Sequence, residues 1–99
     1  MPGKRIAIIG AGPVGIEAAF FARLQGFEVV ILEKGKFAAN VRSWGHVRLF
    51  SPFGVNSSEW GRGALAGSPL PPDDALLTGS EFFEQYLLPL RQQPLLEGC

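Results

Sequence analysis

Residues 5–15 read RIAIIGAGPVG and combine a short apolar run with three glycines in the spacing G-x-G-x-x-G. An isoleucine-rich run that ends at a glycine cluster is typical of a strand buried on both faces. Pro13 suits the first turn of a helix, where its missing N–H is not needed. Residues 14–25, VGIEAAFFARLQ, are mostly strong helix formers, and Gly26 stands where a helix stops. The stretch therefore predicts a strand over residues 5–9 followed by a helix.

A second apolar run, EVVILE at residues 28–33, follows this helix closely. Strand, helix and strand within so few residues predict a βαβ unit over residues 5–34. The polar residues Glu17, Arg23 and Gln25 do not gather on one face of the helix, so we expect it to be covered on more than one side.

Each glycine of the motif has a separate physical role if it joins a strand to a helix. Gly10 allows a tight turn, Gly12 lets a diphosphate approach the backbone, and Gly15 allows close packing of helix on sheet. The helix N-terminus then presents free N–H groups and about half a positive charge to an anion. The alternative is that the three glycines only connect two elements and hold no ligand.

Glu33 lies 21 residues after Gly12, at the end of the second run. An acid in this register accepts hydrogen bonds from ribose hydroxyls and repels a 2′-phosphate, which favours FAD or NAD over NADP. In the alternative without a ligand, Glu33 is only a polar strand end.

Regular patterning fades over residues 35–77. Residues 47–50 are compatible with a short strand, but 12 of the 22 residues from 51 to 72 are Gly, Pro or Ser. So many helix and strand breakers predict an irregular or poorly ordered excursion on the cofactor side.

Regularity returns at residues 78–92, where Thr78 and Glu81 match a capping box. We expect a helix over residues 79–88 that Pro89 ends or kinks. Four residues recur at helical spacing and are expected in the core: Phe82, Phe83, Tyr86 and Leu87.

Composition excludes several classes of protein. The chain has 99 residues, 46% hydrophobic, so it suits one globular domain or a piece of one, not two. Nine basic and nine acidic residues give no net charge, which argues against nucleic-acid partners and basic membrane-surface binding. A single cysteine, Cys99, and a single histidine, His46, offer no disulfide framework and no metal ligand set. Glycines interrupt the first apolar run and no stretch approaches the ~18 apolar residues of a membrane span, so we interpret the chain as cytoplasmic.

The segments GAGPVGIEAA (residues 10–19) and VVILEKG (residues 29–35) resemble the N-terminal FAD-binding segment of flavoenzymes with two dinucleotide-binding domains. That group includes flavin-containing monooxygenases and pyridine nucleotide-disulfide reductases. VNSSEW, PLPPDD and TGSEFFEQYL (residues 55–60, 69–74 and 78–87) resemble, in their order, segments of the monooxygenases.

The resemblance implies an α/β, Rossmann-like fold that is incomplete, with residues 1–99 as a partial dinucleotide-binding domain. It implies that FAD, not NAD, is the cofactor, with NAD(P)H as co-substrate of the parent enzyme. It also implies an adenosine ribose held by Glu33 and an Asn-Ser-Ser stretch near the isoalloxazine. The cofactor-binding residues that follow from it are Gly10, Gly12, Pro13, Val14, Gly15, Glu33, Lys34 and Asn56; it assigns no catalytic residue.

The sequence also departs from the family pattern, which restricts how much of the family's activity we expect of this chain. A second glycine motif, the long monooxygenase fingerprint and paired redox cysteines are all absent from the sequence, and the Gly-Gly-x-Trp-like segment appears only as NVRSWGHV at residues 40–47. The chain resembles about the first quarter of such enzymes, so we expect a fragment whose partner is the remainder of the parent flavoenzyme. A non-catalytic or truncated nucleotide-binding module and an NAD-dependent dehydrogenase domain are the alternatives.

Basic and aromatic residues alternate in the middle of the chain and have two interpretations. They contact flavin or phosphate groups, or they are solvated charges beside packed rings. His46 is in addition a candidate acid or base. These residues are Arg42, Trp44, His46, Arg48, Trp60 and Arg62.

Overall fold

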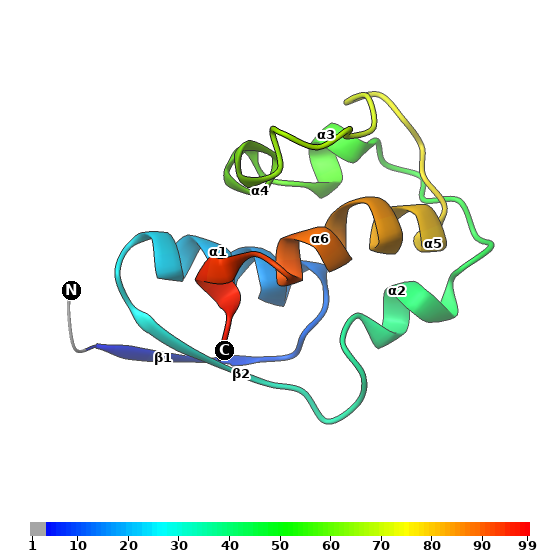
Figure 1. The fold of residues 1–99 in the computed structure, drawn as a ribbon. Helices are drawn as coiled ribbons and strands as arrows, with labels where there is room; N and C mark the ends of the chain where they lie inside the picture. Colours follow the sequence, from blue (N-terminus) through cyan, green and yellow to red (C-terminus); the bar gives the residue numbers. More distant parts are fainter. Residues whose placement is uncertain (1–3) are drawn as a thin grey trace.

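The computed structural model describes residues 4–99, so residues 1–3 of the expected domain lie outside the described part. It begins with strand β1 (Arg5–Ile9), helix α1 (Pro13–Leu24) and strand β2 (Glu28–Leu32). The strands pair in parallel, from Arg5 opposite Glu28 to Ile9 opposite Leu32, with α1 packed on the sheet (Figure 1). The predicted strand–helix–strand unit is confirmed, and the described chain is an α/β structure with one two-stranded parallel sheet.

Helix α1 starts and stops where the sequence predicts. Pro13 occupies the first turn after the N-cap Gly12. At the other end Gly26 has a φ of +90°, a left-handed conformation that favours glycine and ends the helix. The helix contacts both strands on one side and the later helical segments 59–64 and 94–96 elsewhere, which confirms cover on more than one side. Its buried residues are Ile16, Ala19, Phe20 and Ala22.

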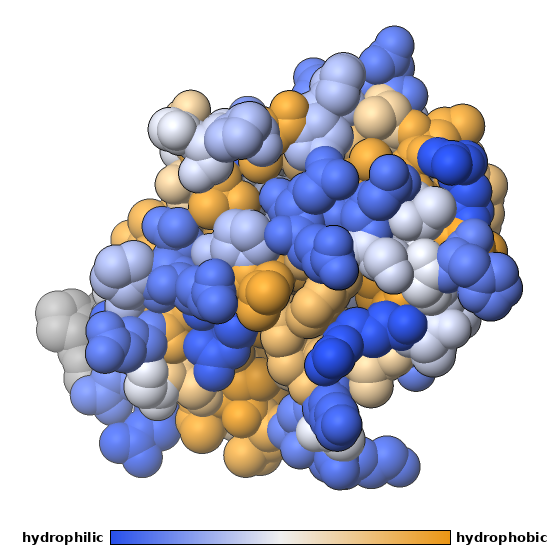
Figure 2. Space-filling view, turned by 45° about the vertical axis from the view of Figure 1, so that its right-hand side comes forward, coloured by the Kyte–Doolittle hydropathy of each residue, from blue (hydrophilic) through white to orange (hydrophobic). Residues whose placement is uncertain are grey.

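The expectation that the first strand is buried on both faces is wrong. Both strands alternate between exposed and half-buried positions, and Ile8, Val29 and Ile31 face the core. The opposite face is open, with Ile9 80% and Leu32 49% exposed. The helices of residues 4–99 all lie on one side of the sheet in Figure 1. Within the described residues, the opposite face of the sheet therefore has no covering layer. Hydrophobic surface accordingly reaches the lower part of Figure 2, the level of the sheet in Figure 1.

The excursion over residues 35–77 is more regular than predicted. It contains helices α2 (Ala39–Ser43), α3 (Phe53–Asn56) and α4 (Glu59–Ala64). Its prolines and serines start helices in place of breaking them: Pro52 is the N-cap of α3, and the Ser58 hydroxyl caps α4 by accepting from the Gly61 N–H (2.9 Å). The strand expected at residues 47–50 is reduced to a single antiparallel bridge between Arg48 and Thr78.

The C-terminal helix runs past Pro89, which was expected to end or kink it, so the helix does not end there. Segments α5 (Gly79–Phe82), η1 (Phe83–Leu87) and α6 (Leu88–Arg91) follow one another without a break. The predicted capping box is confirmed. Segment η1 is a π-helix placed just before Pro89, and such a widened turn accommodates a proline that lacks an N–H and crowds the preceding turn. A short 3₁₀ helix, η2 (Pro94–Leu96), ends the chain's regular structure.

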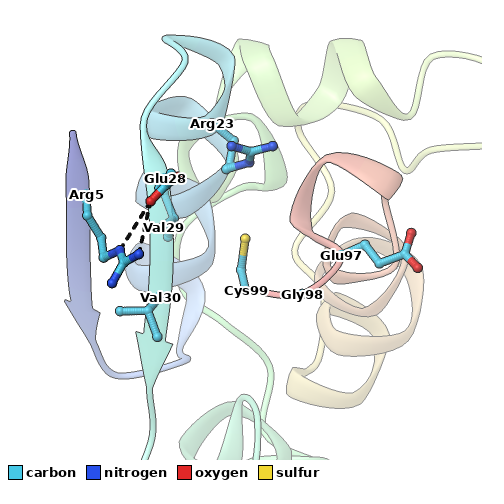
Figure 3. Close-up of a pocket in the computed structure, with 8 residues that line it drawn as sticks. All are labelled: Arg5, Arg23, Glu28, Val29, Val30, Glu97, Gly98 and Cys99. Carbon is cyan, nitrogen blue, oxygen red and sulfur yellow. Dashed lines mark hydrogen bonds and ion pairs between the residues drawn. The ribbon is translucent and has the colours of Figure 1, made fainter. Parts of the chain in front are cut away.

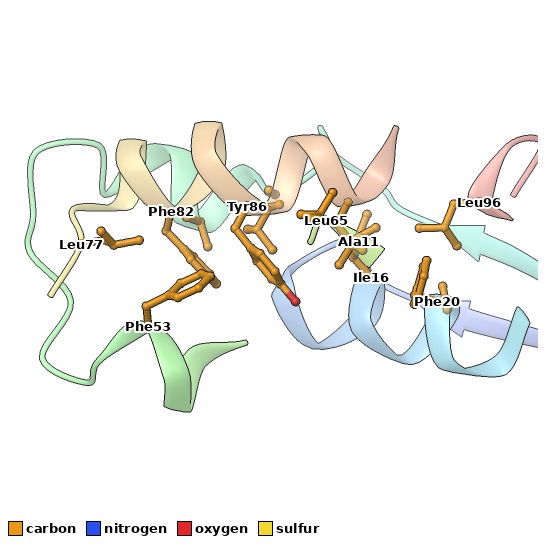
Figure 4. Packing of buried hydrophobic residues seen from close by; sticks show 14 residues of the cluster. Ala11, Ile16, Phe20, Phe53, Leu65, Leu77, Phe82, Tyr86 and Leu96 are labelled. Atoms are coloured by element: carbon orange, nitrogen blue, oxygen red, sulfur yellow. The ribbon is translucent and has the colours of Figure 1, made fainter. Parts of the chain in front are cut away.

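The hydrophobic core lies between α1 and the C-terminal helix (Figure 4). Tyr86 is at its centre, with its ring edge-on to Phe53 (centroids 5.2 Å apart) and stacked with Phe82 (5.7 Å). Phe82, Tyr86 and Leu87 are buried as predicted, whereas Phe83 is only half-buried. In the described part of the chain, each helix is too short or too polar to cross a membrane.

Candidate functional site

The glycine turn between β1 and α1 has the geometry that its spacing predicts. Gly10 has a φ of +104°, and its N–H donates to the carbonyl of Leu32 on β2 (2.7 Å). A Cβ on Gly15 would lie 2.2 Å from the carbonyl oxygen of Gly10. The tight turn at Gly10 and the close packing at Gly15 are therefore confirmed, because a side chain at either position is strained or clashes.

The N-terminus of α1 faces open space. The first amides of a helix have no partner within it, and the N-cap Gly12 has no side chain to satisfy them. A Cβ on Gly12 would meet nothing within 4 Å, and Val14 is 83% exposed. Pro13 contributes no donor. The N–H groups of Gly12, Val14 and Gly15 are thus the backbone donors available to an anion at this end of the helix.

The carboxylate of Glu33 reaches back to the same turn. Its Oε1 accepts from the Ala11 N–H (2.7 Å), and its Oε2 accepts from the Gly35 N–H (2.8 Å). These two bonds, that from Ala11 foremost, lower the pKa of Glu33 below its ordinary value. The acid that the spacing singles out therefore sits beside the glycine turn as an anion, although it is exposed to solvent.

A cavity of about 300 Å³ opens between this carboxylate and the helix N-terminus. Lys34 lies at its wall with an exposed side chain. One wall comes from the glycine turn and the end of β2, and the other from α2. Its lining residues are Gly12, Pro13, Glu33, Lys34, Gly35, Ala39, Asn40 and Val41.

A second, more apolar cavity of about 480 Å³ is also lined by Pro13. Pro13 and Val41 line both cavities, so the two meet at the start of α1. Asn56 and Ser51 are the polar residues at its wall. The rest of its lining is apolar or aromatic: Pro13, Val14, Val41, Trp44, Leu49, Phe50, Val55 and Phe82.

The side chain of Asn56 is held in a fixed orientation at this second cavity. Its Nδ2 donates to the Ser51 carbonyl (2.8 Å), and its Oδ1 accepts from the Ser51 hydroxyl (2.6 Å). The structure thus brings Asn56 to the same end of α1 as Glu33: Glu33 lines the first cavity, Asn56 lines the second, and Pro13 lines both.

The basic residues of the middle segment interact within the chain. The Arg42 guanidinium lies over the Phe83 ring (4.9 Å to its centroid), and Arg48 pairs with Glu81 (3.9 Å). Arg62 donates to the carbonyls of Gly54 and Ser57 and to the Ser57 hydroxyl. His46 is exposed. These contacts favour packing and loop bracing over contact with a ligand.

The two tryptophans of the same segment have different surroundings. Trp44 is half-exposed at the wall of the apolar cavity. Trp60 packs edge-on against Phe21 of α1, with ring centroids 4.9 Å apart. Only Trp44 is therefore placed to meet a ligand at the start of α1.

Sequence reasoning missed a polar cluster beside the apolar cavity. The Glu17 carboxylate accepts from the Ser58 N–H (3.2 Å), the Ser58 hydroxyl and the Tyr86 hydroxyl. Burial first, then the bond to Glu17, raises the pKa of Tyr86 well above its ordinary value. The available signal was Glu17, a lone carboxylate in a helix whose first half is otherwise apolar.

Another hollow, of about 460 Å³, lies along the outer edge of β2 (Figure 3). The Ile31 N–H donates to the Cys99 carbonyl there (3.0 Å), so the C-terminal segment lies against the strand. Arg5 and Glu28 form an exposed ion pair at its rim (3.2 Å). No residue of the glycine turn lines this hollow, so it is separate from the candidate site.

Comparison with models of known protein families matches residues 7–85 to pyridine nucleotide-disulphide oxidoreductases. The matched range includes the glycine turn, Glu33, Asn56 and the C-terminal helix up to residue 85. Neither the curated proteins nor the solved structures contain a match to this chain.

Proposed function

The chain belongs to the pyridine nucleotide-disulphide oxidoreductase family, a family of flavoprotein oxidoreductases, and we propose that it is the FAD-binding N-terminal part of such an enzyme. In this proposal residues 1–99 form part of a Rossmann-like domain, residues 5–34 are its dinucleotide-binding unit, and the parent enzyme uses NAD(P)H. The order of the segments at residues 55–60, 69–74 and 78–87 favours a monooxygenase-like member.

The observation that carries the proposal is the position of Glu33. Its carboxylate lies within hydrogen-bond distance of the Ala11 amide, and it shares a cavity with Gly12 and Pro13. An acceptor beside a bare helix N-terminus suits a nucleotide, whose ribose hydroxyls donate and whose phosphates accept.

The residues around the start of α1 fit the diphosphate and the adenosine ribose of a dinucleotide. Gly12, Val14 and Gly15 provide N–H donors for the phosphates, while Gly10 and Pro13 set the shape of the turn. Glu33 accepts from the adenosine ribose, and Lys34 lies at the wall of the same cavity. The chain's contribution is thus to bind and orient the adenosine diphosphate half.

The apolar cavity suits a flat aromatic ring. Trp44 and Phe82 are among its lining residues, and Asn56 adds an amide held by Ser51. An isoalloxazine placed there would be shielded from water by apolar side chains and would meet one oriented polar group. Bound flavin supplies hydride acceptance to such a site.

Titration of the purified chain with FAD, followed by flavin fluorescence, tests the proposal. We expect saturable binding that Glu33→Ala weakens about tenfold or more, because a hydrogen bond to a charged acceptor is stronger than one between neutral groups. Lys34→Ala is the comparison, since it alters the neighbouring residue of the same cavity, and we expect it to weaken FAD binding less than Glu33→Ala does. Circular dichroism of each variant verifies that it is folded.

Three results would contradict parts of the proposal. Equal losses in the two variants would remove the ribose role of Glu33. NAD that competes better than FAD would favour a dehydrogenase domain. A folded chain without saturable binding would favour a module that does not bind the cofactor.

A further inference from the structure

Glu17 joins three segments that are far apart in the sequence. It lies on α1, and its carboxylate receives hydrogen bonds from the N-cap of α4 and from Tyr86 of the C-terminal helix. Figure 4 shows the Tyr86 ring packed between Phe82 and the residues of α1. The carboxylate therefore has three protein donors at a site that is only partly open to water.

The chain packs tightly around the cluster of Glu17, Ser58 and Tyr86. A Cβ on Gly61 would lie 1.9 Å from the Tyr86 hydroxyl oxygen and 3.2 Å from Glu17 Oε2. The Ser58 hydroxyl both donates to Glu17 and accepts from the Gly61 N–H. Glu17 thus fixes the start of α4 through Ser58, whose hydroxyl acts as a donor and as an acceptor at once.

The segment held in this way is the one that carries Asn56. Asn56 comes two residues before Ser58, and both line a hollow of about 250 Å³ together with Val14 and Glu17. The Glu17 carboxylate is one helical turn beyond Pro13 on α1. One short stretch of α1 therefore presents its N-terminus to the candidate diphosphate site and its first carboxylate to the Asn56 segment.

We propose that Glu17 is a positioning residue that sets Asn56 against the flavin ring. This inference rests on the proposed function. Because Glu17 acts on residues 56–58 and not on the donors of the diphosphate site, its loss weakens binding of the ring half of FAD and spares the adenosine half.

The experiment compares ADP and FAD as probes of the two halves. Glu17→Ala removes all three acceptor contacts, and Glu17→Gln keeps the shape of the side chain but loses its charge. Glu84→Gln is the matched control, because it makes the same change at an exposed residue of the C-terminal helix. Dissociation constants for ADP and FAD, the visible circular dichroism of bound flavin and hydrogen exchange of the Ser58 amide are measured for each variant.

We expect Glu17→Ala to bind ADP within twofold of the unmodified chain and FAD about tenfold more weakly. Its flavin dichroism is expected to decrease, and its Ser58 amide to exchange faster. Glu17→Gln gives intermediate values, which keeps the test valid if the alanine variant does not fold, and Glu84→Gln leaves all readouts unchanged. A purely structural role of Glu17 would lower ADP and FAD binding in parallel.

Parallel losses for the two probes would therefore overturn the inference, as would an unchanged FAD-to-ADP ratio with unchanged flavin dichroism. Failure of the unmodified chain to bind FAD would overturn the proposed function and this inference together. FAD binding by the unmodified chain with an unaltered ratio in both Glu17 variants would overturn this inference alone.

Discussion

Replacement of Gly15 by alanine tests whether the strand and the helix are as close as the structure places them. A Cβ there would lie 2.2 Å from the Gly10 carbonyl oxygen and 3.1 Å from its carbon. Both are backbone atoms, so no side-chain rotation relieves the contact. Since non-bonded heavy atoms rest about 3.5 Å apart, helix and turn must separate by about 1 Å.

The turn resists this separation because it is held at two points. The Gly10 N–H bonds to the Leu32 carbonyl (2.7 Å), and the Gly12 carbonyl accepts from the Ile16 N–H (3.0 Å). Overpacking of this kind costs about 1–3 kcal/mol, whereas alanine in place of glycine in a helix gains at most about 1 kcal/mol. We expect Gly15→Ala to lower the free energy of unfolding by about 1–2 kcal/mol. For a domain of this size the melting temperature then falls by about 4 °C or more.

Gly63→Ala is the matched control, because Gly63 is also helical and a Cβ there would meet nothing within 4 Å. We expect it to leave stability unchanged or to raise it by up to about 1 kcal/mol. Urea unfolding followed by tryptophan fluorescence, with thermal melts by circular dichroism, measures both variants. A Gly15→Ala chain as stable as the unmodified one, or an equal loss in Gly63→Ala, would refute the close approach of α1 to the turn.

Two further predictions concern the carboxylate at the turn and the tyrosine in the core. The pKa of Glu33 is lowered by the Ala11 and Gly35 amides, so its anion stabilises the fold above its ordinary pKa, and this contribution is lost as the pH falls through the lowered value. Urea midpoints from about pH 7 to about pH 2 should therefore show Glu33→Gln less stable near neutrality and the gap closing in acid; a constant gap would contradict it. Gly61→Ala should lose about 1–3 kcal/mol through its 1.9 Å approach to the Tyr86 oxygen. Adding Tyr86→Phe removes that oxygen, so the double variant should be more stable than the sum of single losses predicts, by about 0.5 kcal/mol or more, and strict additivity in urea unfolding would argue against the contact.

Local signals were sufficient to predict the first third of the fold. The glycine spacing, Pro13 at the helix start and Gly26 at its end act within a few residues of the structure they specify. The capping box at Thr78 is equally local. Such features are readable without knowing where the rest of the chain lies.

The remainder depends on contacts between distant residues. Helix α4 is capped by Ser58, whose hydroxyl donates to Glu17 on α1, 41 residues earlier. Tyr86 and Glu17 are separated by 69 residues. The exposure of Ile9 and Leu32 was also unpredictable, because an apolar strand predicts burial without saying whether a second layer is present. The candidate residues Glu33 and Asn56 were predicted, but the carboxylate that links α1 to the Asn56 segment was not.

The most direct test of the cofactor site is to observe the backbone amides at the start of α1 as FAD is added. In ¹⁵N-labelled chain, we predict that the amide signals of Gly12, Val14 and Gly15 shift saturably with FAD and also with ADP, while that of Gly63 does not move. A folded chain in which these three signals stay fixed, or in which saturable shifts fall only elsewhere, would contradict the account.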